Sequence, residues 1–138
     1  MRRIHLLIGL ATTIAFVLTG QVMSHHHPKV AQLPAEFRLM YVSRHIYLLG
    51  AALVNTALGL YLRMQPAGWR RFLQQAGSLL ILTSPLILLL AFFVEPEFGI
   101  SGRGWRGYFG MITLFVGVMM HVVANVGSRG IDTTREHP

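Results

Sequence analysis

The chain has 138 residues, of which 53% are hydrophobic and only 12% are charged, about half the charged share of an ordinary soluble domain. A net charge of +7 would suggest a nucleic-acid partner in a soluble protein, but here the Lys and Arg residues lie beside long apolar stretches, where cations meet lipid headgroups. The absence of cysteine excludes disulfides, thiolate metal sites and thiol nucleophiles, and the short loops exclude a second domain or an aqueous catalytic core.

The first apolar stretch is Ile4–Met23, which follows Arg2 and Arg3. A signal peptide begins in the same way, but this stretch is long and no small-x-small cleavage site precedes Ser24. We therefore expect an uncleaved helix that crosses a bilayer, which takes about 20 mostly apolar residues. Helical spacing places its small and polar residues on one face. They are His5, Gly9, Thr12, Phe16, Thr19 and Met23.

Histidines gather after the first stretch, on the outer side of the membrane. Imidazole with a thioether suits copper, and imidazole with a carboxylate suits zinc. The candidate ligands are His25, His26, His27 and His45, with Met23 or Glu95 as a further ligand. The alternative is a solvated loop that contacts lipid headgroups.

The second stretch is Ile46–Leu62, and it carries an amide near mid-membrane. Asn55 lies ten residues after His45, which is about 15 Å along a helix. Such a side chain needs a hydrogen-bond partner on a neighbouring helix. The inward face predicted for this helix contains Tyr41, His45, Ala52, Asn55, Thr56 and Gly59.

The third stretch is Phe72–Val94, with a proline near its middle. Pro85 removes one backbone hydrogen bond and is expected to bend the helix, while Thr83 or Ser84 satisfies the freed carbonyl. Glu95 is expected in solvent at the outer surface. The inward face contains Gln74, Gly77, Ser78, Ser84, Pro85, Phe92 and Glu95.

The fourth stretch is Gly107–Val126, followed by a polar tail, 127–138, that is too short to fold alone. Gly110 and Gly117 are expected to mark its closest packing. The inward face contains Arg106, Gly107, Gly110, Thr113, Gly117, His121, Ala124, Asn125 and Ser128.

Two of the histidines lie on inward faces of membrane helices, and ionisable residues there are functional candidates. His5 and His121 form a second candidate site, for b-type haem held by two imidazoles, although their predicted depths differ by about 9 Å. The alternative is a neutral His121 that bonds a Thr or Asn of a neighbouring helix.

These faces predict an all-α, single-domain, polytopic membrane protein, with four transmembrane helices in an up-down-up-down bundle. The loop from Arg63 to Arg70 and Arg71 contains no acid, so we expect it in the cytoplasm. Both termini would then be cytoplasmic. The polar side chains expected to hold the interior together are Asn55, Thr56, Ser84, Thr113 and Asn125.

The segments IHLLIGLATTIAFVLTGQVM, SRHIYLLGAALVNTALGLYL and LLLAFFVEP together resemble a class of small bacterial inner-membrane proteins without an assigned role. The resemblance covers nearly the whole chain and implies the four-helix fold. The first helix, through His5, Gly9, Thr19 and Gly20, is also similar to the first helices of PepSY-type and cytochrome b561-type membrane proteins. In the latter type, histidines of facing helices hold haem.

The sequence contains no GxSxG, HExxH, phosphate-binding loop or paired intramembrane carboxylates, so we expect no enzyme. The first hypothesis is a non-enzymatic accessory or scaffold protein of the inner membrane, with a membrane-protein partner or a second copy of itself. No cofactor is firmly implied. The alternatives are a redox or metal-handling protein, with haem b or with copper or zinc at the sites above, and a small transporter that works as an oligomer.

Overall fold

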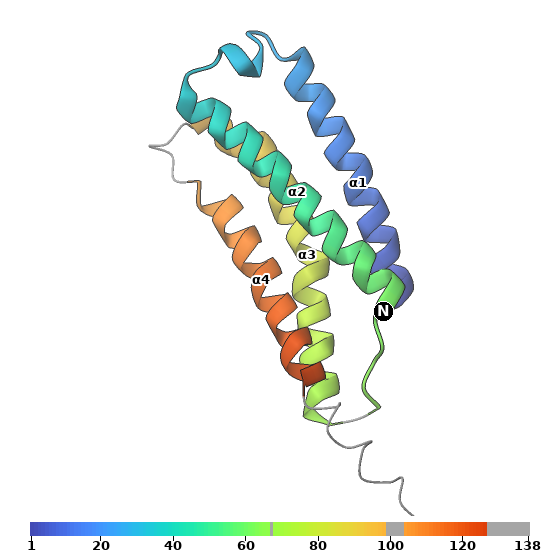
Figure 1. The fold of residues 1–138 in the computed structure, drawn as a ribbon. Coiled ribbons are helices and arrows are strands. Elements are labelled where there is room, and N and C mark those ends of the chain that lie inside the picture. Colours follow the sequence, from blue (N-terminus) through green and yellow to red (C-terminus); the bar gives the residue numbers. More distant parts are fainter. Residues whose placement is uncertain (67, 99–103, 127–138) are drawn as a thin grey trace, which may run out of the picture.

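The computed structural model describes residues 1–66, 68–98 and 104–126, so the predicted polar tail lies outside the described residues. Within these ranges the chain forms helices α1 (Arg2–His25), α2 (Ala35–Tyr61), α3 (Trp69–Phe98) and α4 (Trp105–Val126) (Figure 1). A short 3-10 helix, η1 (Val30–Gln32), connects α1 to α2. The all-α prediction is confirmed.

Three of the described helices are long and apolar enough to cross a membrane, and together they indicate a membrane protein. They are Arg2–His25, Trp69–Pro96 and Trp105–Val126. The helix α2 is not among them, although it has 27 residues. It starts at Ala35 rather than at Ile46, and polar residues such as Ser43, Arg44 and Asn55 lower its apolar character.

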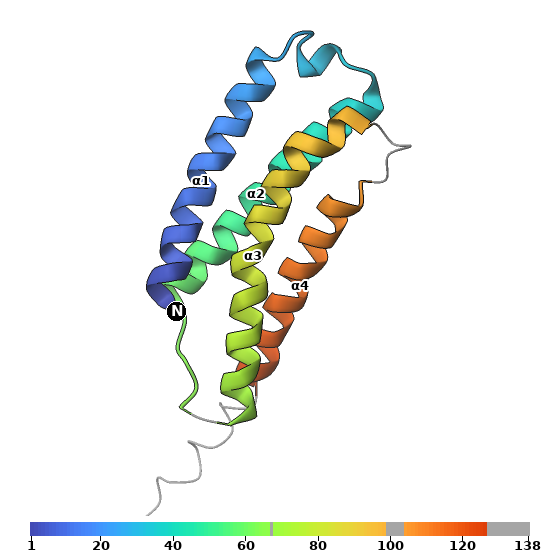
Figure 2. The same ribbon diagram turned by 180° about the vertical axis from the view of Figure 1, so that it is seen from behind.

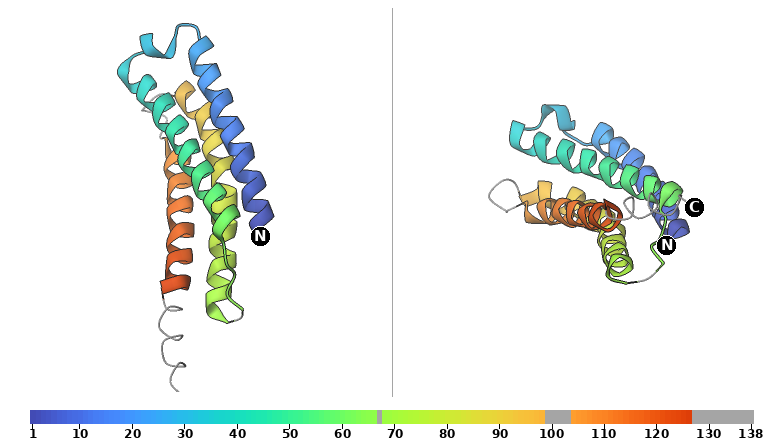
Figure 3. Two further views of the ribbon diagram at one scale, coloured as in Figure 1. Left: turned by 45° about the vertical axis from the view of Figure 1, so that its right-hand side comes forward. Right: turned by 60° about the horizontal axis from the view of Figure 1, so that its bottom comes forward.

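The helices pack as two pairs, α1 with α2 and α3 with α4, and the pairs meet mainly through α2 and α3 (Figures 1 and 3). In the first pair, small residues let the backbones approach closely. A Cβ on Gly9 would lie 2.7 Å from the Thr56 nitrogen, and a Cβ on Gly59 would lie 2.6 Å from the Leu6 nitrogen. The start of α1 therefore lies against the end of α2.

Arg2 adds a polar contact at the same end of this pair. Its guanidinium donates to the carbonyl oxygens of Gly59 and Leu60, at 3.4 and 2.7 Å. The last carbonyls of a helix lack partners within the helix and carry its negative dipole end, so a cation is favourable there.

In the second pair, glycines on both helices set the closest approach. A Cβ on Gly77 would lie 2.8 Å from the Gly117 oxygen, and a Cβ on Gly110 would lie 2.8 Å from a methyl carbon of Leu88. The predicted role of Gly110 and Gly117 as points of close packing is therefore confirmed.

The helix α3 changes direction near its middle (Figure 2), where Pro85 lies. Proline has no N–H to offer the carbonyl four residues earlier, which is that of Ile81. Two side chains replace the lost donor: Ser84 Oγ at 3.0 Å from the same helix, and Asn55 Nδ2 at 3.2 Å from α2. The predicted use of Ser84 is confirmed, and the second donor turns the bend into a link between the helix pairs.

Among the described residues, the predicted small and polar faces are buried or partly buried, except for Asn125, which is exposed at the edge of α4. Ser128 of the predicted face lies outside the described residues. Large apolar side chains cover the outside of the helices, as lipid contact requires; examples are Leu7, Leu53, Leu86 and Phe115. Between the polar contacts lies an apolar core of Leu48, Ala51, Ile81, Leu88, Phe92 and Leu114.

Candidate functional site

A buried polar cluster centres on Asn55. Its Nδ2 donates to the carbonyl oxygens of Ala51 and Ile81, at 3.0 and 3.2 Å, which fixes the orientation of the amide. The Asn55 Oδ1 must then accept, and it lies 2.9 Å from His5 Nδ1. Neutral His5 therefore carries its proton on Nδ1 and a lone pair on Nε2. This Nε2 is buried and has no hydrogen-bond partner among the described residues.

A second histidine lies on the α4 side of the interior. His121 Nε2 is 3.1 Å from Ser78 Oγ on α3. Its Nδ1 is buried and, within the described ranges, also has no hydrogen-bond partner. Each histidine is thus oriented by a neighbouring helix through one nitrogen, while its other nitrogen has no hydrogen-bond partner in the described part of the chain.

Replacing Asn55 by leucine is expected to lower the free energy of unfolding by about 1–3 kcal/mol, because the buried His5 Nδ1–H loses its acceptor. The Ile81 carbonyl also loses one of its two side-chain donors. Equilibrium unfolding in detergent micelles measures the loss. Ser84→Ala is the matched control: it removes only one donor from the same carbonyl, at an expected cost of about 0.5–1.5 kcal/mol. Equal losses in the two variants would contradict a bridging role for Asn55.

A buried ion pair joins α2 to α3 at the end of the bundle opposite to His121. Arg44 Nε on α2 donates to Glu95 Oε2 on α3 at 2.6 Å, and the two side chains are only 12% and 2% exposed. Glu95 Oε1 accepts from the Gly107 N–H of α4 at 2.8 Å. The prediction that Glu95 lies in solvent is therefore wrong. Both of its oxygens have partners, and the pair joins three helices.

Glycine makes room for this ion pair. A Cβ on Gly104 would lie 2.5 Å from Arg44 Nη2, and a Cβ on Gly107 would lie 2.8 Å from Arg44 Cζ. The guanidinium thus occupies space that any larger residue at the start of α4 would fill.

The predicted outer metal site is not assembled. His25 bonds the Gln21 carbonyl, His27 is exposed, and His26 faces Tyr41, 3.3 Å from its hydroxyl. His45 is held elsewhere, 2.9 Å from Thr19 Oγ1 and stacked on Phe16. Among the residues that the structure describes, no three His, Asp or Glu side chains are grouped as a metal ion requires. Consecutive residues at a helix end point in different directions, so adjacency in sequence did not bring the imidazoles together.

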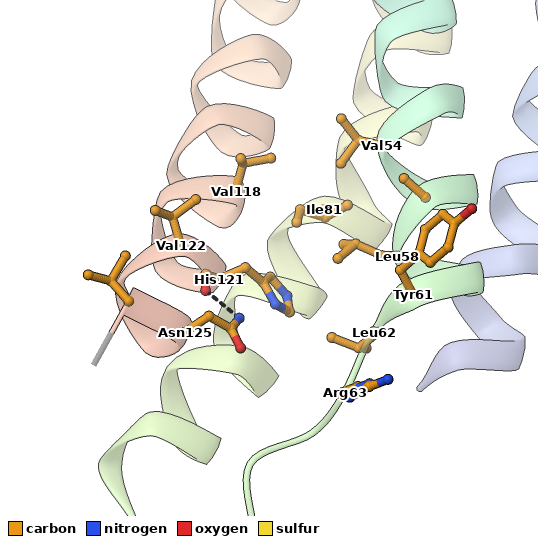
Figure 4. A pocket seen from close by; sticks show the side chains of 12 residues that line it. Val54, Leu58, Tyr61, Leu62, Arg63, Ile81, Val118, His121, Val122 and Asn125 are labelled. Carbon is orange, nitrogen blue, oxygen red and sulfur yellow. Dashed lines mark hydrogen bonds between the residues drawn. The ribbon is translucent and has the colours of Figure 1, made fainter. Parts of the chain in front are cut away.

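A cavity of about 710 Å³ opens between the C-terminal ends of α2 and α4 (Figure 4). Its walls are mainly apolar, and Arg63, Tyr61, His121 and Asn125 contribute polar groups. Figure 4 shows the His121 ring directed from α4 toward α3 and Ile81, with Asn125 donating to the His121 carbonyl oxygen at 2.7 Å.

For the predicted haem site, the structure brings His5 and His121 into one interior but not onto opposite walls of this cavity. His121 is among the described lining residues, and His5 is not. A porphyrin between two axial imidazoles needs both rings to face the same space. In the described ranges, the buried imidazole nitrogens without a hydrogen-bond partner are Nε2 of His5 and Nδ1 of His121.

The remaining residues of the predicted interior lie in different surroundings. Thr113 is buried and bonds the Phe109 carbonyl of its own helix, and Thr56 is half-buried against Gly9. The prediction did not include a contact made by Gln74, which is fully buried. Its side chain accepts from the Gln65 N–H at 2.8 Å and donates to the Arg63 carbonyl at 3.1 Å. The sequence signal for this contact is an amide side chain on the predicted inward face, close to the start of the third apolar stretch. Such a side chain needs a hydrogen-bond partner, and here the backbone of the preceding loop provides it.

Comparison of the chain with protein-family models, with curated proteins and with solved structures finds no match.

Proposed function

We propose that this chain is an integral protein of the bacterial inner membrane, with four spans and no catalytic activity of its own, that works as an accessory or scaffold subunit. The observation that carries the proposal is how the interior polar groups are used. Asn55 of α2 makes hydrogen bonds to His5 of α1 and to the Ile81 carbonyl of α3. The hydrogen bond between Ser78 and His121 joins α3 to α4. Such bonds between small, polar faces hold membrane helices together, which leaves the lipid-facing surfaces for a partner.

The proposal includes α2 as the fourth span. A helix of 27 residues is roughly 40 Å long, enough for the hydrocarbon core. Its polar residues are covered by the flanking helices: Asn55 by α1 and α3, and Arg44 by Glu95 of α3. A helix shielded on both sides needs less apolar sequence than one exposed to lipid.

The topology is tested by cysteine labelling, since the chain has no cysteine of its own. We expect Lys29→Cys, between α1 and α2, to react in intact cells with a maleimide that cannot cross the membrane. Arg71→Cys, at the start of α3, should react only after the cells are opened, because the arginine-rich loop is expected in the cytoplasm. Labelling of both positions in intact cells would contradict four spans with cytoplasmic termini.

The accessory role is tested on protein purified in mild detergent. We expect a colourless preparation that carries a membrane-protein partner in fixed ratio or is a homo-oligomer. A Soret absorption band that is lost in His121→Ala would contradict this role and support the haem alternative. Monomeric protein without a partner would also contradict it.

A further inference from the structure

The cavity between α2 and α4 lies where these helices diverge. Towards their C-terminal ends α2 stays against α1, while α4 stays against α3, so the two helices separate (Figure 3). The volume of about 710 Å³ lies within the usual range for ligand sites, about 300–1,000 Å³.

The walls divide into an apolar body and a polar rim. Val54 and Leu58 of α2 face Val118 and Val122 of α4, and Ile81 of α3 lies between them (Figure 4). An apolar ligand chain would bury these surfaces. The rim carries Arg63, just after the end of α2.

Hydrogen bonds to the loop backbone fix the position of Arg63 at this rim. Gln74, fully buried at the start of α3, donates to the Arg63 carbonyl and accepts from the Gln65 N–H. The side chain of Arg63 is exposed. None of the described lining residues is Asp or Glu. The rim is therefore cationic, and its charge complements an anion.

We propose that this cavity binds an anionic phospholipid of the surrounding bilayer, with an acyl chain between α2 and α4 and the phosphate at Arg63. Arginine recognises phosphate through charge-assisted hydrogen bonds. The inference rests on the proposed membrane location and is independent of the accessory role. A failure of the membrane location would appear separately in the cysteine labelling described above.

The test measures lipids that the full-length protein retains in native mass spectrometry. Delipidated protein receives phosphatidylglycerol or phosphatidylcholine with identical acyl chains. We expect phosphatidylglycerol to bind about fivefold more tightly, as one arginine near a membrane surface provides. Arg63→Gln should remove this preference, because a neutral side chain no longer distinguishes the net anionic headgroup from the zwitterionic one. Equal binding of the two lipids by the wild-type chain would overturn the proposal.

A matched pair of variants tests the cavity itself. Val122 and its neighbour Val123 are similarly exposed, at 46% and 53%, but Val122 lines the cavity and Val123 does not. Val122→Trp should abolish retention of both lipids, and Val123→Trp should retain them. Ala57→Phe fills the opposite wall and gives a second variant if Val122→Trp does not fold. Lipid retention unchanged in both cavity variants, or a change of oligomeric state without a change in lipid binding, would overturn the proposal.

Discussion

Replacing Glu95 by alanine is expected to lower the free energy of unfolding by about 3–5 kcal/mol, the usual cost of removing one partner from a buried ion pair. Two donors would lose their carboxylate acceptor: the Nε–H of Arg44, whose side chain is 12% exposed, and the N–H of Gly107. The Arg44 charge would also lose its counter-ion, although its other nitrogens keep their bonds to Ser43 and Gly104. In equilibrium unfolding in detergent micelles, the midpoint should move to a lower denaturant concentration, while the dependence of the free energy of unfolding on denaturant concentration stays unchanged.

A double variant separates the interaction energy of the ion pair from the effect of removing each side chain alone. In Arg44→Met/Glu95→Leu no charge stays buried, and apolar replacements of similar volume are often neutral. We expect this variant to be more stable than either Arg44→Met or Glu95→Leu alone. Arg38→Ala is the control, since Arg38 is exposed and its side chain makes a single hydrogen bond to the residues that the structure describes, to the Ala31 carbonyl at 3.5 Å. Its effect should stay within about 0.5 kcal/mol. If the losses of the two single variants add in the double variant, the charges are not coupled.

Replacing Gly59 by alanine is expected to lower the free energy of unfolding by about 1–3 kcal/mol, the usual cost of overpacking. The new methyl group would lie 2.6 Å from the nitrogen and 2.7 Å from the Cα of Leu6. These are backbone atoms of α1, so relief requires the two helices to move apart. The same unfolding measurement reports the loss.

The control for Gly59→Ala is Gly50→Ala, the same substitution at another glycine of α2. A Cβ on Gly50 meets nothing within 4 Å. Alanine is the better helix former by about 1 kcal/mol, so Gly50→Ala should leave the protein equally stable or stabilise it. A loss in Gly50→Ala as large as that in Gly59→Ala would show that the clash with α1 is not the cause.

Much of the fold could be predicted because lipid limits what a sequence can do. Each span must satisfy its own backbone, so it is a helix, and polar side chains must turn inward. His5, Asn55, Ser84 and Thr113 are all buried. Pro85 even identified the carbonyl that would need a donor, since the missing N–H always faces the residue four positions earlier.

The features that could not be predicted depend on how separate helices meet. Arg44 and Glu95 each lie at the end of an apolar stretch, where a charged residue alone indicates contact with water. Only the packing of α2 against α3 makes them partners. Asn125 lies in the predicted sector of its helix, but α2 and α4 diverge there, and the side chain is exposed. The cavity has the same origin, and no pattern within one helix encodes it.

The pairing of α1 with α2, and of α3 with α4, has a consequence for how the protein is made. Contacts between neighbouring segments form fastest, and a chain emerges from the ribosome with its N-terminal half first. The first two helices can therefore assemble while the later ones are still being synthesised. The amide of Asn55 and the guanidinium of Arg44 are then in place before α3 arrives, and α3 supplies the Ile81 carbonyl and the Glu95 carboxylate that they bind. The order of the helices along the chain is thus also the order in which they become available for packing.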